Sequence, residues 1–148
     1  MNLKDALKEE NILIDVEVKD WMEAVNKAGE LMIDLGIALP SYTEGMVEVM
    51  KTLGPYAVIA PGVALPHAHP DKGGLKVGLV LLKLKTPVSF GSPNDPVNLI
   101  LAFAAIDNTG HVELLKELAL FLSQKGVLEE LHKTSSKEEI RSLIERHC

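Results

Sequence analysis

Two long apolar runs constrain the fold of this chain more than any other feature. Residues 76–85 read Lys-Val-Gly-Leu-Val-Leu-Leu-Lys-Leu-Lys, and residues 97–106 are apolar except for Asn98. A strand with one face in water alternates apolar and polar residues, whereas a strand covered by helices on both faces is almost continuously apolar. The two runs therefore predict a sheet that is buried between two layers of helices.

Capping signals and periodicity place the other elements. Asp20 and Ser41 are each followed three residues later by a glutamate, the capping-box pattern of a helix start, and Gly36 and the Gly54-Pro55 pair stand where these helices should end. We expect helices over 3–10, 20–36, 41–53, 109–124 and 136–146, a short helical turn over 127–132, and strands over 12–18, 56–60, 76–85 and 97–106. This order predicts one α/β domain over residues 1–148, a three-layer sandwich in which helices flank a mixed β-sheet on both faces.

The charge balance argues against several classes of protein. The chain has 15 Lys+Arg against 21 Asp+Glu, a net charge of −6, and only 4% aromatic residues, so it lacks the basic surplus and the stacking platforms of a nucleic-acid-binding protein. The longest uninterrupted apolar run, 99–106, is far shorter than the roughly 18 residues of a membrane-spanning helix. Charged residues stand where a signal peptide would be apolar, and the single cysteine, Cys148, cannot form an internal disulfide. We expect a cytoplasmic protein.

The most unusual segment is 60–70, which reads Ala-Pro-Gly-Val-Ala-Leu-Pro-His-Ala-His-Pro. Its prolines and glycine surround His67 and His69, and His67 directly follows Pro66. Because proline fixes φ, such a loop can hold a side chain in place at little further entropic cost. Either the loop presents a functional histidine, or it is a rigid surface loop whose histidines cap backbone groups.

His111 is the second candidate. It follows Asp107-Asn-Thr-Gly at the junction between the predicted strand 97–106 and the predicted helix 109–124. The N-terminus of a helix exposes N–H groups and carries a partial positive charge, so an anion such as a phosphoryl group can bind there. In sheets covered by helices, ligands usually bind beyond the carboxyl ends of strands, where both histidines are expected. The alternative is that His111 simply faces water at the start of a helix.

Three kinds of chemistry could use these histidines. His67, His69 and His111 could ligate a metal, for which a bare His-x-His is a weak motif. Two of them could act as general acid and base in a substrate pocket. In the third case, one imidazole is a covalent nucleophile that accepts a phosphoryl group and the other stabilises that group, because phosphoryl transfer chiefly requires positioning and charge-stabilising donors.

Three segments together resemble a known family. They are Ala-Pro-Gly-Val-Ala-Leu-Pro-His at 60–67, Asp-Pro-Val followed by Ala-Ala-Ile-Asp within 95–107, and His-Val-Glu-Leu-Leu at 111–115. This combination resembles the enzyme IIA domain of the mannitol/fructose class of the bacterial sugar phosphotransferase system (PTS), over essentially the whole chain. Gly-Pro-Tyr at 54–56 and Ala-Pro-Gly at 60–62 most resemble the ascorbate-type branch, whose enzyme IIA is a free-standing protein.

The resemblance implies a phosphocarrier that needs no metal and no cofactor. His67 matches the phosphorylated histidine of the family, which accepts a phosphoryl group from the carrier protein HPr. That histidine passes the group to a cysteine of a cognate enzyme IIB, which serves the membrane enzyme IIC. His111 matches the second active-site histidine, which hydrogen-bonds the phosphoryl group. Pro66, Asp107 and Thr109 are expected to support the site.

One part of the family's site differs in this chain. The mannitol-specific member has an active-site arginine upstream of the histidine, and the matching position here is Lys51. A lysine can supply charge but not the planar, bidentate fork of a guanidinium. Both arginines of the chain, Arg141 and Arg146, fall in the last predicted helix.

Other assignments stay open at this level. The transported sugar is expected to be L-ascorbate, with mannitol, fructose and galactitol as alternatives. A nitrogen-type regulatory module, which senses phosphorylation without feeding transport, is a different class of function. The apolar side chains within 46–50 either belong to the core or contact a second copy in a homodimer. His132, His147 and Cys148 are expected to be surface residues.

Overall fold

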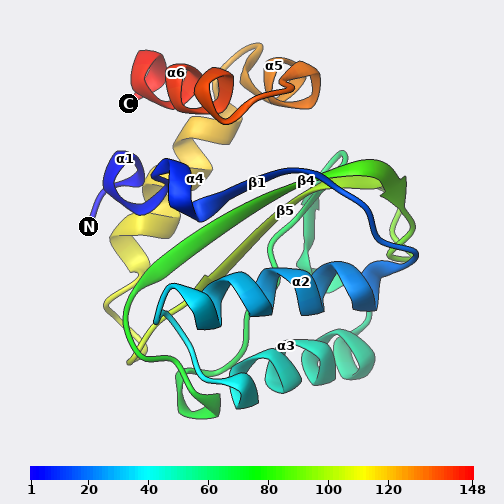
Figure 1. The fold of residues 1–148 in the computed structure, drawn as a ribbon, viewed down its shortest axis with the longest axis vertical. Coiled ribbons are helices and arrows are strands. Elements are labelled where there is room, and N and C mark those ends of the chain that lie inside the picture. The colour runs from blue at the N-terminus through cyan, green and yellow to red at the C-terminus, as the bar shows by residue number, and fades with distance from the viewer.

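A five-stranded mixed sheet lies between two layers of helices in the computed structural model, which describes residues 1–148 (Figure 1). The helices are α1 (Leu3–Ala6), α2 (Trp21–Asp34), α3 (Pro40–Leu53), α4 (Val112–Ser123), α5 (Val127–Lys133) and α6 (Lys137–His147). The strands are β1 (Ile12–Val16), β2 (Val58–Ala60), β3 (Val63–Ala64), β4 (Gly78–Val88) and β5 (Val97–Ala104). Three short 3-10 helices cover Glu9–Asn11, Pro55–Ala57 and Pro70–Lys72. The predicted three-layer α/β fold is confirmed.

The strand order β1-β4-β5-β3-β2 decides which loops meet. The pairs β1/β4 and β3/β5 are parallel, whereas β4/β5 and β2/β3 are antiparallel. Because β3 and β5 run in the same direction side by side, their carboxyl ends lie at the same edge of the sheet. The segment that follows β3 carries His67, and the segment that follows β5 carries His111. The topology therefore brings the two histidines toward each other.

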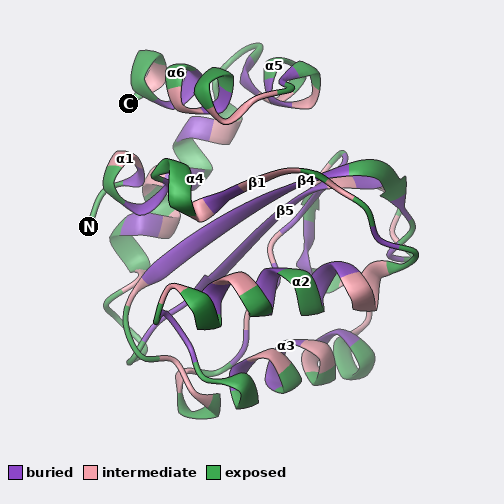
Figure 2. Ribbon diagram, viewed as in Figure 1, coloured by how far each residue is buried: buried purple, intermediate pink, exposed green.

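Side chains of the central strands β4 and β5 belong to two separate hydrophobic cores, one on each face of the sheet. Leu79 and Leu81 of β4 pack with α1, α4, α5 and α6, whereas Val80 and Leu82 pack with α2 and α3. β5 alternates in the same way, and Figure 2 shows both strands buried over most of their length. Each buried aliphatic side chain contributes roughly 1.5–3 kcal/mol relative to an exposed one. The apolar runs are thus explained by burial on both faces.

The start of α2 is as predicted, but the start of α3 is not. The Asp20 carboxylate accepts a hydrogen bond of 2.9 Å from the amide of Glu23, which is the expected cap. α3 instead begins at Pro40, whose fixed φ suits the first position of a helix. Ser41 lies inside the helix and donates its hydroxyl to the carbonyl of Lys72 at 2.6 Å. The second predicted capping box is therefore wrong, because proline and a tertiary contact take over its role.

Other differences concern short elements. The predicted helix over 3–10 ends at Ala6, and the predicted strand over 56–60 begins with a 3-10 turn that runs through Ala57. β3 was not expected, since two residues in a loop rich in proline and glycine give no periodic signal. The short turn predicted at 127–132 is confirmed as α5. None of the helices has the length and the apolar character that crossing a bilayer requires.

The apolar side chains of 46–50 mainly belong to the core. Met46 is fully buried and Met50 is 6% exposed, and both pack in the core under α2 and α3. Val49 is partly buried and lines the depression described below. The core interpretation is confirmed for the two methionines.

Candidate functional site

A backbone carbonyl selects one nitrogen of His67. The ring nitrogen Nδ1 lies 2.9 Å from the carbonyl oxygen of Leu65, and a carbonyl can only accept a hydrogen bond. Nδ1 of the neutral imidazole must therefore carry the proton, which leaves the lone pair on Nε2. Between the two residues, Pro66 is buried and its carbonyl accepts a hydrogen bond of 3.2 Å from the amide of Phe103. The loop is thus tied to β5 directly beside the histidine.

Phe103 contacts both candidate histidines. Its ring centroid lies 4.8 Å from that of His67 with an interplanar angle of 18°, and 5.5 Å from that of His111 with an angle of 25°. These are stacked arrangements. Sequence reasoning missed Phe103, because a phenylalanine inside an apolar run is indistinguishable from an ordinary core residue.

His111 is the N-cap residue of α4, and its Nδ1 is buried without a hydrogen-bond partner. The Asp107 carboxylate accepts hydrogen bonds from the amides of Gly110 at 2.6 Å and of Thr109 at 3.0 Å. These amides favour the ionised form, so the pKa of Asp107 lies below its ordinary value. Asp107 thus occupies the two amides that directly precede His111, and with Thr109 it shapes the turn before α4.

The histidines open into a depression of about 480 Å³ between α3, the loop after β3, the end of β5 and α4. Apolar side chains make up most of its wall, namely Val49, Leu53, Tyr56, Leu65, Ala68, Phe103, Ala105 and Leu115. His67, His69, His111 and Asn108 supply the polar groups. No lysine or arginine lines it. Asn108 had not been expected in the site.

Lys51 does not reach this depression. It is exposed on α3, and because successive residues rotate by about 100° around a helix, it lies on the side opposite Val49 and Leu53. The expectation that Lys51 replaces the arginine of the family is therefore wrong. Arg141 donates to the carbonyls of Lys4 and Leu7, at 2.8 and 2.9 Å, and thus serves α1 rather than the site.

His69 has a local structural role. Its Nδ1 accepts a hydrogen bond of 3.2 Å from the amide of Asp71 and so caps the 3-10 helix Pro70–Lys72. The capping interpretation is therefore correct for this histidine, although its ring also borders the depression. The structure contains no group of three or more His, Cys, Asp or Glu side chains arranged to hold a metal ion.

The C-terminal residues lie away from the depression. His132 Nε2 is 3.0 Å from the carbonyl of Pro61, so this ring contacts the turn between β2 and β3 instead of lying free on the surface. His147 Nδ1 is 2.8 Å from the side-chain oxygen of Gln124, and Cys148 is exposed. None of the three belongs to the candidate site.

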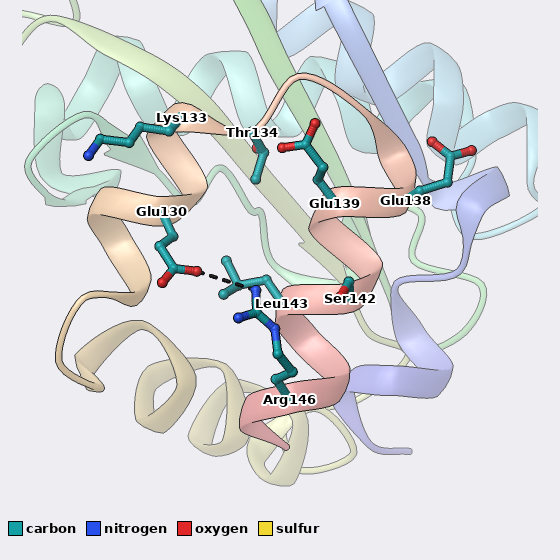
Figure 3. A pocket seen from close by; sticks show the side chains of 8 residues that line it. All are labelled: Glu130, Lys133, Thr134, Glu138, Glu139, Ser142, Leu143 and Arg146. Carbon is teal, nitrogen blue, oxygen red and sulfur yellow. Dashed lines mark hydrogen bonds and ion pairs between the residues drawn. The ribbon is translucent and has the colours of Figure 1, made fainter.

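A second hollow, of about 430 Å³, lies between α5 and α6 (Figure 3). Its wall is polar and charged apart from Leu143, and its one ion pair joins Arg146 to Glu130 at 3.4 Å. The side chains of Lys133 and Glu138 point away from each other at its two ends (Figure 3). Since it contains neither a histidine nor a cysteine, the depression at His67 is the better candidate site.

The chain is similar to known proteins over nearly its whole length. Residues 5–147 match the family model described as "Phosphoenolpyruvate-dependent sugar phosphotransferase system, EIIA 2". The chain is 33% identical over 149 residues to the ascorbate-specific PTS system EIIA component of Salmonella typhimurium, an alignment that covers 99% of this chain and 97% of that protein. It is 32% identical over 146 residues to the mannitol-specific cryptic phosphotransferase enzyme IIA component of Escherichia coli, covering 99% of both chains.

Solved structures agree with these matches. The solution structure of the same mannitol-specific cryptic enzyme IIA component superimposes with a TM-score of 0.88 over 99% of both chains. The enzyme IIAMTL chain in a complex with phosphorylated enzyme IIBMTL from Escherichia coli gives a TM-score of 0.81 at 28% identity, over 95% of this chain and 97% of that one.

Proposed function

The chain belongs to the EIIA 2 family of the phosphoenolpyruvate-dependent sugar phosphotransferase system, and from this membership we propose that it carries the phosphoryl group on Nε2 of His67. The observation that carries the proposal is the hydrogen bond between His67 Nδ1 and the carbonyl of Leu65. It holds the proton on one nitrogen and leaves the other with a free lone pair in the depression.

The transfer is a displacement at phosphorus. The Nε2 lone pair of His67 attacks the phosphorus of a phosphohistidine on HPr, the P–N bond to HPr breaks, and its electron pair stays on the donor imidazole. In the second step a cysteine thiolate of enzyme IIB attacks the same phosphorus, and the P–N electron pair returns to Nε2. Throughout both steps Nδ1–H donates a hydrogen bond to the carbonyl of Leu65, which stabilises the positive charge of the phosphorylated ring.

His111 is proposed to stabilise the phosphoryl group. Its buried Nδ1 has no partner in the protein, and an unpaired buried polar group costs roughly 1–3 kcal/mol. A phosphoryl group in the depression supplies hydrogen-bond acceptors next to this imidazole. Because the His111 ring lines the depression, it is placed beside a phosphoryl group bound there. Asp107, Thr109 and Pro66 act indirectly, through the turn before α4 and the loop before His67.

An exposed apolar rim suits the docking of protein partners. Leu53 and Tyr56 line the depression and are 61% and 75% exposed. Ile106 and Val112, which are 57% and 50% exposed, follow the lining residues Ala105 and His111 in the chain. Exposed apolar side chains gathered around a site are typical of protein-protein contact. We take HPr and enzyme IIB as the successive partners, and the similarity to an enzyme IIA solved with its phosphorylated enzyme IIB supports the second.

The transport substrate is proposed to be of the L-ascorbate type, with mannitol as the second candidate. The ascorbate-specific relative at 33% identity supports the first, and the mannitol-specific relative at 32% supports the second. In either case the protein acts in the cytoplasm and meets the membrane enzyme IIC only through enzyme IIB.

The test is phosphorylation in a reconstituted system. Incubation with enzyme I, HPr and phosphoenolpyruvate is expected to label the wild type with acid-labile phosphate, and His67→Gln is expected to remain unlabelled. His147→Gln is the matched control, because it changes a histidine that lies outside the depression. Labelling of His67→Gln at the wild-type level would overturn the proposal.

A panel of enzyme IIB proteins then separates transport from regulation. An ascorbate-type or mannitol-type enzyme IIB is expected to remove phosphate from the labelled protein, and His111→Gln is expected to accept phosphate but to transfer it at least about ten-fold more slowly. Labelling without transfer to any enzyme IIB would instead favour a regulatory, nitrogen-type module.

A further inference from the structure

We propose that Tyr42 and Phe103 form a positioning pair that fixes His67 and His111 relative to each other for phosphoryl transfer. The proposal rests on the phosphocarrier function proposed above. Neither residue takes part in bond making or breaking. Both act through the histidines.

Tyr42 is the hydrogen-bonding centre of the pair. Its ring is fully buried in α3 at 1% exposure, and its hydroxyl accepts a hydrogen bond of 3.0 Å from the amide of Ala68, the residue after His67. The same oxygen lies 2.8 Å from the carbonyl of Phe103 and 3.1 Å from the carbonyl of Ala68. A hydroxyl has one proton, so it donates to one of these carbonyls at a time. One atom therefore joins the histidine loop to the end of β5.

Phe103 extends this connection to both imidazoles. Its amide donates to Pro66, its carbonyl accepts from Tyr42, and its ring stacks on His67 and His111. Phe103 and Tyr42 thus hold the backbone on the two sides of His67, at Pro66 and at Ala68. The ring of Phe103 also contacts both histidines. Nothing else that lines the depression contacts both imidazoles through stacking.

Removal of the hydroxyl should loosen this arrangement while leaving the packing intact. Tyr42→Phe keeps the buried ring but leaves the Ala68 amide and the Phe103 carbonyl without their partner. Displacement of a reacting group by about 1 Å can lower a rate about 100-fold. Burial raises the pKa of Tyr42, so the hydroxyl keeps its proton at neutral pH and the network stays intact there.

The experiment measures transfer from phosphorylated HPr over a range of HPr concentrations. For Tyr42→Phe we expect the maximal rate to fall about ten-fold or more, with the half-saturating HPr concentration within about two-fold of wild type. The structural control is Thr134→Val, which deletes another buried hydroxyl that donates to a backbone carbonyl, that of Leu131 at 2.7 Å, away from the site. It should lower stability while leaving both transfer parameters unchanged.

A double-mutant cycle tests whether the two residues act as a unit. Phe103→Leu should also lower the maximal rate, and the double variant should be about as slow as the slower single variant, because either change breaks the same connection. Independent, multiplicative losses would overturn the pair. A Tyr42→Phe protein that transfers at the wild-type rate would overturn it as well, whereas an unlabelled wild type would instead refute the phosphocarrier function.

A measurement on the wild type keeps the proposal testable if Tyr42→Phe does not fold. The Tyr42 hydroxyl proton should exchange slowly with water and give a resolved NMR signal with contacts to the Ala68 amide. A hydroxyl proton in fast exchange would contradict the network.

Discussion

At the scale of single residues, a carbonyl oxygen decides which nitrogen of His67 carries the proton. Leu65 is held by the loop after β3, and its carbonyl fixes the proton of His67 on Nδ1. The sequence indicates the loop through its prolines, and it indicates His67 through its position after Pro66. The tautomer of His67 depends on a single hydrogen bond to a residue two positions away. No pattern of residue types in the sequence predicts such a bond.

The first prediction concerns this tautomer. Nitrogen-15 NMR should show that the neutral imidazole of His67 carries its proton on Nδ1. Phosphorylation should shift the Nε2 resonance. The physical reason is that the Leu65 carbonyl can only accept a hydrogen bond, so Nδ1 must donate one. Protonation of neutral His67 at Nε2, or a phosphoramidate at Nδ1, would contradict the geometry.

The second prediction concerns Asp107 and pH. The amides of Gly110 and Thr109 hold the pKa of this carboxyl below its unfolded value, so its contribution to stability is complete above the unfolded pKa and is lost as the pH falls through the folded pKa. Asp107→Asn should therefore lower the melting temperature at pH 7, and the difference from wild type should shrink in strong acid. The melting temperatures of both proteins, measured from pH 7 to pH 2, give this difference. If it is the same at every pH, the charge of Asp107 has no such role.

Sequence reasoning identified the two candidate histidines better than the side chains that contact them. Histidines at the ends of strands are conspicuous, so His67 and His111 were expected, and the topology confirms that the two segments share one edge of the sheet. Phe103 and Tyr42 were missed because their roles depend on contacts across 61 positions of the chain. Once the bounds of α3 are known, the rotation of about 100° per residue places Lys51 on the side opposite Val49 and Leu53, away from the lining of the depression.

At the scale of elements, a buried lysine joins the sheet to the C-terminal end of α5. Lys83 is 8% exposed on β4, and its ammonium donates to the carbonyls of Leu131 and His132 at 2.8 Å each and also to that of Thr134. The last carbonyls of a helix have no partner within the helix, and the helix dipole favours a cation there. In the sequence, Lys83 is only a charged residue within an apolar run, and nothing there predicts its contacts with α5.

The third prediction follows from this contact. Lys83→Met should lower the free energy of unfolding by about 2–3 kcal/mol, since the variant leaves buried carbonyls unpaired. Lys85→Met on the same strand is the matched control and should change it by less than about 0.5 kcal/mol, because Lys85 is exposed. Urea denaturation of both variants gives the comparison. Equal free energies of unfolding for Lys83→Met and the wild type would show that the ammonium of Lys83 contributes nothing to stability.

At the scale of the whole molecule, the chain ends are joined to each other rather than to the site. Arg141 of α6 donates to the carbonyls of Lys4 and Leu7 at the end of α1, so the first and last helices are fastened together. Both pack on the face of the sheet opposite α2 and α3 (Figure 1). This face carries stability, whereas the loops at the edge of the sheet carry the candidate site.

The fourth prediction separates these two contributions. Arg141→Ala should destabilise the fold by about 1–3 kcal/mol through the loss of two charged hydrogen bonds, yet the rate of phosphorylation by HPr should stay at the wild-type level. Arg146→Ala is the control, because its exposed ion pair with Glu130 is worth at most about 1 kcal/mol. A loss of phosphorylation in folded Arg141→Ala would mean that an arginine serves the transfer after all.

The placement of the two termini also bears on how such a domain can be assembled into larger proteins. The N and C labels lie on the same side of the molecule, in the layer of α1 and α6, and the wall of the depression is built only from residues between Val49 and Leu115 (Figure 1). A partner domain tethered to either end by a flexible linker would leave His67 uncovered. Tethering would also raise the local concentration of that partner to the millimolar range without any new contact surface. The same carrier can therefore serve as a separate protein or as one module of a covalent relay.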